Sequence, residues 1–174
     1  MMTTARVNID DTSTVVVVDA AGDTPGGRYV IPAGIDSLRR SHFTSDPPAP
    51  EDLTNAIGEM LDHLADARRH TPALVEATTV VVSGPGPRAI AFVEFGGVVD
   101  APTHVLTREA TEEVFRILAT ENASERRLNP GLPAGLVDSI VAGCCALVAL
   151  MRGLHLGTLI VDLAPQDAAA ISTE

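Results

Sequence analysis

The chain of 174 residues is 45% hydrophobic and carries a formal net charge of −11 at neutral pH. This length suits one domain, with a core large enough to bury roughly two thirds of the surface of the unfolded chain. The 12 basic residues, all arginine, are outnumbered by 23 acids, so the surface as a whole repels polyanions. We therefore expect no nucleic-acid partner.

The beginning of the chain predicts three strands. Residues 6–9 and 14–20 are rich in β-branched side chains and flank a polar turn at residues 10–13, a pattern typical of a hairpin. A second turn, rich in glycine and proline, leads into residues 28–32, where Pro32 favours a place at a sheet edge. The chain therefore opens with a predicted antiparallel meander.

The next stretch predicts a long helix after an irregular connection. We expect residues 33–49 to be irregular. Residues 50–70 begin with a proline, which suits a first helical position, and acids follow in the first turn. The apolar residues recur at intervals of three and four, which indicates an amphipathic helix: Leu53, Ile57, Leu61 and Leu64.

The middle of the chain predicts a core strand, two helices and a loop. Residues 78–82 form the strand and run directly into the Gly-Pro-Gly-Pro sequence of residues 84–87. We expect a short helix at residues 88–95 and a loop at residues 99–104. Thr107 is placed to cap the following amphipathic helix, and a short helical turn is expected around Arg126.

Residues 136–151 predict a buried helix, because their only strongly polar side chains are Asp138 and Ser139 and no face is left for water. The run is shorter than the roughly 20 apolar residues that span a bilayer, so we expect no membrane partner. After Gly157 the sequence TLIVDLA predicts a last core strand. Helix and strand together indicate an α/β core.

The two cysteines, Cys144 and Cys145, are neighbours in the predicted buried helix. Their Cβ atoms point in different directions, so a disulfide between them would break the helix. No cysteine or histidine spacing suggests a metal site. We expect two small core side chains in a reducing cytoplasm, and the N-terminus lacks the apolar segment of a secretory signal.

Three strands followed by alternating helices and strands is the order of one half-unit of the actin-like ATPase and ribonuclease-H-like folds. Residues 45–53 resemble the segment before the first helix in the second domain of the exopolyphosphatase/guanosine-pentaphosphate phosphatase (Ppx/GppA) family, and residues 105–118 resemble its next helix. Most specific is the likeness to the family pattern ER…PGL…D.IVAG, carried here by Glu125, Arg126, Pro130, Gly131, Leu132, Asp138 and residues 140–143. The likeness spans nearly the whole chain, which we interpret as one module of this kind over residues 1–174, with a flexible tail at residues 165–174.

The resemblance also implies where phosphate would bind in the family. Its second-domain loop resembles Asp-Ile-Gly-Gly-Gly-Ser-Thr, and its other glycine turn resembles Gly-Gly-Thr. Here aspartates replace two glycines of the first loop and would repel a phosphate, while prolines interrupt the second and offer no N–H. We interpret seven residues as vestigial phosphate-loop positions: Asn8, Asp10, Asp11, Thr12, Ser13, Gly84 and Gly86.

Other features of the family also differ here. Two family arginines fall at Ser37 and Leu136. The family's first domain, which carries the metal-binding acid and the glutamate base, lies outside the resemblance. We therefore predict no catalytic residue, no resident metal and no cofactor in this chain.

Other interpretations of the polar residues carry less weight. Asp10 and Asp11 could bind a divalent cation, but two acids in a turn more often form a solvated hairpin. Ser13 has no nearby histidine in sequence to activate it. The five histidines lack metal-ligand spacing, and His104 is expected to bond a backbone carbonyl.

Two functions from different classes remain. The chain could be an exopolyphosphatase-related pseudoenzyme that acts by binding a partner, including a second copy as a homodimer. Alternatively it could be one half of a split phosphohydrolase for polyphosphate or guanosine tetra/pentaphosphate, completed by a separate first domain and Mg²⁺. A site refitted for an uncharged or cationic metabolite also stays open.

Overall fold

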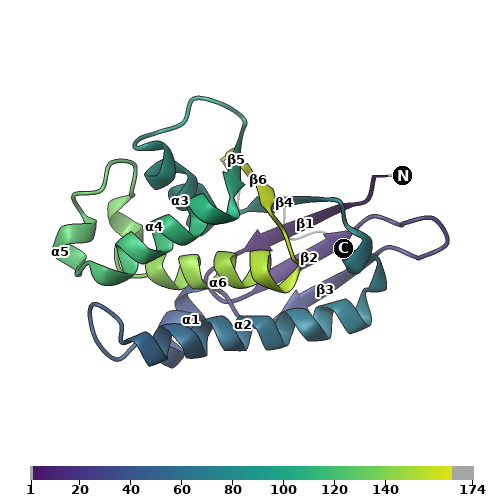
Figure 1. The fold of residues 1–174 in the computed structure, drawn as a ribbon, viewed down its shortest axis with the longest axis horizontal. Coiled ribbons are helices and arrows are strands. Elements are labelled where there is room, and N and C mark those ends of the chain that lie inside the picture. The colour runs from purple at the N-terminus through teal and green to yellow at the C-terminus, as the bar shows by residue number, and fades with distance from the viewer. Residues whose placement is uncertain (1, 166–174) are drawn as a thin grey trace.

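The computed structural model describes residues 2–165, so most of the predicted flexible tail lies outside the described residues. Six strands form one mixed sheet in the order β3-β2-β1-β4-β6-β5 (Figure 1). They are β1 (Thr4–Ile9), β2 (Thr14–Val18), β3 (Gly27–Ile31), β4 (Thr79–Ser83), β5 (Thr103–Thr107) and β6 (Thr158–Asp162). The antiparallel meander β1-β2-β3 and the edge position of β3 confirm the sequence prediction.

The centre of the sheet is parallel. Strand β1 pairs with β4, and β4 pairs with β6, both in parallel, while β5 is antiparallel to β6 at the far edge. Parallel strands place their carboxyl ends at the same edge of a sheet. The turn after β1 and the loop after β4 therefore come together, which is where open α/β sheets usually bind ligands.

The helices form a second layer in front of the sheet (Figure 1). They are α1 (Ile35–His42), α2 (Pro50–His70), α3 (Pro85–Phe95), α4 (Arg108–Thr120), α5 (Ala123–Arg126) and α6 (Ile140–Gly153). Short 3₁₀ turns lie at Pro72–Glu76 and Ala134–Leu136. Within residues 2–165 no helix has the length and apolarity needed to cross a bilayer.

Helix α6 is the centre of the core. Every residue from Ile140 to Met151 is buried, as the absence of a polar face predicts. The helix runs through the middle of the helical layer, between α2 and α4 (Figure 1). It meets α3 at two glycines, and a Cβ on Gly143 would lie at an ordinary contact distance of 3.8 Å from the Cα of Gly86.

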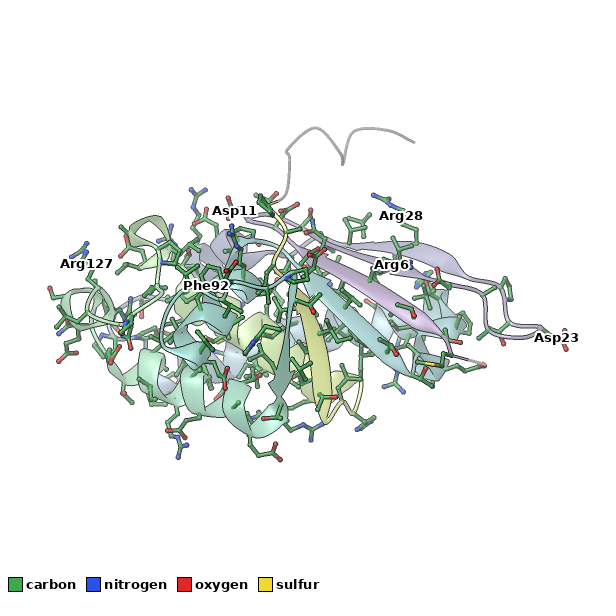
Figure 2. The ribbon with its side chains drawn as sticks, turned by 90° about the horizontal axis from the view of Figure 1, so that it is seen from above. Arg6, Asp11, Asp23, Arg28, Phe92 and Arg127 are labelled. Carbon is green, nitrogen blue, oxygen red and sulfur yellow. The ribbon has the colours of Figure 1, made fainter. Side chains whose placement is uncertain are left out.

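The two faces of the sheet differ, because alternate side chains of each strand point to opposite sides. On the helical side Val7, Val16 and Val82 are buried. On the other side Arg6 on β1 and Arg28 on β3 are exposed, and Figure 2 labels both side chains. The molecule is therefore a two-layer structure with one sheet face open over the described residues.

Four sequence predictions need correction. Residues 33–49 are not wholly irregular, because they include α1, which is only eight residues long and buries just Ile35 and Leu38. The predicted loop at residues 99–104 leads into the missed edge strand β5, whose five residues give too short an alternation to detect. Helix α3 starts at Pro85 rather than at residue 88, and α6 starts at Ile140 rather than at residue 136.

Candidate functional site

The turn between β1 and β2 lies against the N-terminus of α1. The carbonyl oxygen of Asp10 accepts a hydrogen bond from the N–H of Ile35 at 3.0 Å. The carbonyl oxygen of Asp11 accepts from the N–H groups of Asp36 at 2.9 Å and Ser37 at 3.0 Å. The first N–H groups of a helix normally lack intrahelical partners and can bind an anion. In α1 these donors are already used by the neighbouring turn.

Close contact between the turn and α1 depends on Gly34. A Cβ atom at this position would overlap the carbonyl oxygen of Asp10 and the backbone of Asp11. The N–H of Gly34 donates to the Oγ of Ser37 at 2.8 Å. Ser37 therefore acts as a local cap of α1.

The second loop, after β4, joins the same place through Asn8. Asn8 and Ser83 are partners in the β1–β4 register, and the Oγ of Ser83 donates to the Oδ1 of Asn8 at 3.0 Å. The Nδ2 of Asn8 donates in turn to the Oδ2 of Asp10 at 3.0 Å. This chain of side chains links the two predicted loops. We call the turn of residues 10–13, Asn8, Gly34, Ser83, Gly84 and Gly86 the two-loop site.

Helix α3 begins at this site and offers few N–H groups. Gly84 has φ +121°, a conformation that suits glycine, and a Cβ there would overlap the carbonyl oxygen of Ile9. Pro85 and Pro87 have no N–H, and the N–H of Arg88 donates to the carbonyl oxygen of Gly84 at 3.2 Å. Only Gly86 keeps a backbone donor in the first three positions of α3.

The structure thus places all seven predicted positions on or directly beside two adjacent loops, but the groups that they present differ from those of a phosphate site. Asp11 and Thr12 are exposed, whereas Asn8, Asp10 and Ser13 are half-buried. Asp10 and Asp11 contribute negative charge, and the N–H groups of α1 face carbonyl oxygens. Among residues 2–165 no group of three or more His, Cys, Asp or Glu side chains is arranged to hold a metal ion.

Arg88 lies in the first half of α3 and is the cation nearest in sequence to the second loop. Its guanidinium lies 5.2 Å from the centre of the Phe92 ring, a cation–π arrangement. Within the described residues its Nε is buried without a hydrogen-bond partner. The sequence analysis did not single out this arginine.

Arg126, the arginine of the family-like ER pattern, has a structural place away from the two-loop site. It is only 2% exposed. Its guanidinium donates to the carbonyl oxygens of Leu118 at 3.3 Å, Glu121 at 3.1 Å and Val137 at 2.8 Å, and it forms an ion pair with Asp46. It therefore ties the end of α4 and the approach to α6 to the proline-rich segment before α2. Leu136 lies in the 3₁₀ turn before α6.

The histidines form local pairs. The Nε2 of His104 lies 2.7 Å from the Oε2 of Glu94, so the prediction of a backbone carbonyl as its partner was wrong. His42, at the end of α1, and His63, on α2, both contact the carboxylate of Glu59. These contacts join α1 to α2 and lie outside the two-loop site.

Both cysteines are buried and free, as predicted. Burial raises the pKa of the Cys145 thiol to about 12. Burial, followed by the neighbouring Cys145, raises the pKa of the Cys144 thiol still further. A thiol with a raised pKa is a poor nucleophile at neutral pH, so both side chains act as core residues.

Two hollows of the surface are lined by residues outside the two-loop site. A groove of about 880 Å³ runs between the start of α2 and α4, with Leu53 and Phe115 among its apolar residues and Glu109 and Glu112 among its acids. A smaller hollow of about 340 Å³ lies beside Arg126, Asp46 and Arg39. The polar residues predicted from the phosphate loops do not line either hollow.

Sheet order and helix placement define the class of this chain. A mixed six-stranded α/β sheet that begins with a meander and continues through parallel strands is an actin-like ATPase-type fold, as predicted. No protein-family model matches the chain, and no curated protein matches it either.

Solved structures specify the fold further. An exopolyphosphatase-like protein superposes with a TM-score of 0.83 at 16% identity, over 91% of this chain and 54% of that one. The Ppx/GppA phosphatase of Aquifex aeolicus gives 0.80 at 20% identity, over 92% and 53%. An exopolyphosphatase from Cytophaga hutchinsonii gives 0.77 at 11% identity, over 92% and 53%. The chain thus has the fold of about half of a Ppx/GppA protein.

Proposed function

We propose that this chain is an exopolyphosphatase-related module that acts by association and does not hydrolyse phosphoanhydrides by itself. The proposal rests on one observation: few backbone N–H groups are available to bind an anion at the two helix N-termini of the two-loop site. The first N–H groups of α1 are bonded to the carbonyl oxygens of Asp10 and Asp11, and prolines remove donors from α3. Asp10 and Asp11 add negative charge where a phosphate chain would have to approach.

A second candidate function has an observation in its favour. The chain spans about half the length of the Ppx/GppA structures that it superposes on. A separate protein with the other half could therefore complete a split phosphohydrolase, with polyphosphate or guanosine tetra/pentaphosphate as substrate and Mg²⁺ as the metal. The closed N-terminus of α1 argues against phosphate contacts from this half.

A phosphate-release assay with Mg²⁺ and the purified 174-residue chain tests the proposal. We expect no turnover of polyphosphate or guanosine pentaphosphate. The matched control is Asp10→Ala, which removes a charge from the two-loop site. Turnover that follows the purified chain and disappears in Asp10→Ala would contradict the proposal.

A thermal-shift screen tests binding without turnover. A ligand at a hundred times its dissociation constant adds about 2.7 kcal/mol to the free energy of unfolding, which is easily detected. We expect no shift with polyphosphate. Co-purification of a partner that restores hydrolysis would instead support the split enzyme.

A further inference from the structure

The two edges of the sheet are protected to different degrees. Edge strand β3 carries the exposed Arg28, and helix α2 packs beside it. A charge on an edge strand discourages pairing with another chain. Edge strand β5, at the opposite end of the sheet (Figure 1), reads Thr-His-Val-Leu-Thr and contains no aspartate, glutamate or arginine. Of the two edges, β5 is the one open to pairing.

Hydrogen bonds at the ends of β5 establish which backbone groups face outward. The N–H of Leu163 donates to the carbonyl oxygen of Pro102, and the N–H of Arg108 donates to that of Gly157, both at 2.9 Å. Bonding residues alternate in an antiparallel ladder, so His104 and Leu106 bond to β6. Thr103, Val105 and Thr107 therefore direct their N–H and C=O groups towards the free edge.

One of these outward groups is already used. The carbonyl oxygen of Thr107 accepts from the Oγ1 of Thr111 at 2.9 Å, at the start of α4. The remaining outward groups are the N–H of Thr103, Val105 and Thr107 and the C=O of Thr103 and Val105. The described residues provide no backbone partner for them.

The sequence of β5 is complementary to itself. When two copies pair antiparallel about a two-fold axis through Val105, each Val105 lies opposite its counterpart and exchanges two hydrogen bonds with it. The N–H of Thr107 then meets the carbonyl oxygen of Thr103 in the other copy. Threonine faces threonine and valine faces valine, and β-branched cross-strand pairs of this kind are favourable.

Exposed apolar side chains also lie on β5 and in the segment that precedes it in the sequence. Val105 is 58% exposed, Phe95 at the end of α3 is 60% exposed, and Val98 in the α3–β5 connection is 72% exposed. The nearby acid Glu94 is engaged by His104 at 2.7 Å. A chain with a net charge of −11 resists self-association, so an uncharged, apolar edge is the part of its surface best suited to a second copy.

We propose that β5 pairs with β5 of a second copy of this chain, so that one continuous sheet runs through a two-fold dimer. The inference deepens the proposed function by naming the partner and the surface of association. The test of this inference measures association alone. A monomeric chain without activity would contradict the dimer but not the proposed function, whereas a dimer that hydrolyses polyphosphate would contradict the proposed function but not the dimer. Only a few backbone hydrogen bonds join the two copies in this arrangement, and each contributes little net free energy, so the dimer is expected in the micromolar range.

Light scattering over about 1–100 µM chain measures the association. We expect a dimer at the upper end that strengthens with salt, because salt screens the repulsion between the two negative copies. Val105→Lys places a charge at the centre of the pair and is expected to give a monomer. The matched control is Val30→Lys on β3, also an exposed edge valine, which is expected to remain a dimer.

Disulfide trapping tests the geometry. Both native cysteines are buried, so Val105→Cys adds the one readily accessible thiol in the described chain. Residues of a hydrogen-bonded antiparallel pair have Cα atoms about 5.5 Å apart, within disulfide range. We expect Val105→Cys to cross-link under mild oxidation and Val30→Cys not to.

Three outcomes would overturn the proposal. They are a monomeric wild-type chain at about 100 µM in high salt, a Val105→Lys variant that still dimerises, and equal cross-linking of the two cysteine variants. Circular dichroism checks that each variant is folded. We expect the substitutions at position 105 to leave the fold intact, because the N–H of this residue is not used in the ladder with β6.

Discussion

Helix α6 and the start of helix α1 lie in the same layer, but their backbone and side-chain groups are satisfied differently. The side chains around α6 are apolar and interact through packing contacts. At α1 the N–H groups, the turn carbonyls and the Asn8–Asp10 pair satisfy one another. A new charge or a change of side-chain volume is therefore expected to destabilise the α6 core. The two-loop site is instead expected to be destabilised by any change that separates the turn from the helices.

The largest expected effect comes from Arg126, the only cation that is buried among residues 2–165. Arg126→Leu would leave the carbonyl oxygens of Leu118, Glu121 and Val137 without their donor. We expect a loss of about 3–5 kcal/mol in the free energy of unfolding, measured by urea denaturation. Asp46→Asn is the control, because Asp46 is partly exposed and its loss should cost less than about 1 kcal/mol. Equal losses would mean that the ion pair, rather than the carbonyl contacts, is the stabilising element.

The next effect tests the close packing of the two-loop site. Gly84→Ala would force a Cβ into the carbonyl oxygen of Ile9 at a positive φ. We expect a loss of about 3 kcal/mol. The matched control is Gly58→Ala in the middle of α2, where nothing lies within 4 Å of the new Cβ. That change should stabilise the chain by roughly 1 kcal/mol. A mild effect of Gly84→Ala would indicate that the turn and the second loop can move apart.

The last effect, the smallest when taken per thiol and per pH unit, concerns the exclusion of water from the α6 core. The folded state holds the pKa of Cys145 at about 12 and that of Cys144 higher still, because both thiols are buried. In the unfolded chain thiols ionise near pH 8.5, so the contribution is complete below that pH and is lost as the pH rises above it. The free energy of unfolding should fall by about 1.4 kcal/mol per pH unit for each thiol between about pH 9 and pH 10.5.

The composition of the chain allows the contribution of the two thiols to be separated from that of other groups. The chain has no lysine and a single tyrosine, so few other groups titrate in the same range. The control is the double variant Cys144→Ala and Cys145→Ala, whose stability should depend much less on pH. Identical slopes for the two proteins would mean that the thiols are accessible in the folded state.

The same comparison explains what could be predicted from sequence. The strands around the core, the long helix α2 and the buried helix α6 have repetitive apolar patterns, and all were predicted with small errors at their ends. Helix α1 and strand β5 were missed, since each has only a few apolar residues in a short segment. Their existence depends on contacts with distant parts of the chain, such as the hydrogen bonds from α1 to the β1–β2 turn.

The contacts that join the two loops could not be predicted from the sequence. The resemblance indicated Asp10, Asp11, Gly84 and Gly86, and the structure places them on adjacent loops. The resemblance gave no sign that Asn8 and Ser83 join the loops, or that Gly34 allows the turn to cover the N-terminus of α1. These links are between residues far apart in sequence and follow only from the parallel pairing of β1 with β4. One sequence feature drew attention to Arg126, namely its position in the ER pattern. The backbone carbonyl oxygens that it contacts could not be inferred from the sequence.

The place of α6 and β6 near the end of the described chain has a consequence for synthesis on the ribosome. The first 139 residues contain most of the helices and strands, but they lack the helix against which α1, α2, α3 and α4 pack. Until α6 emerges, the apolar sides of those helices remain exposed to water and to other nascent chains. Strand β6 follows later and is the one that connects β5 to the rest of the sheet. The new chain is therefore expected to depend on chaperones until β6 has left the ribosome.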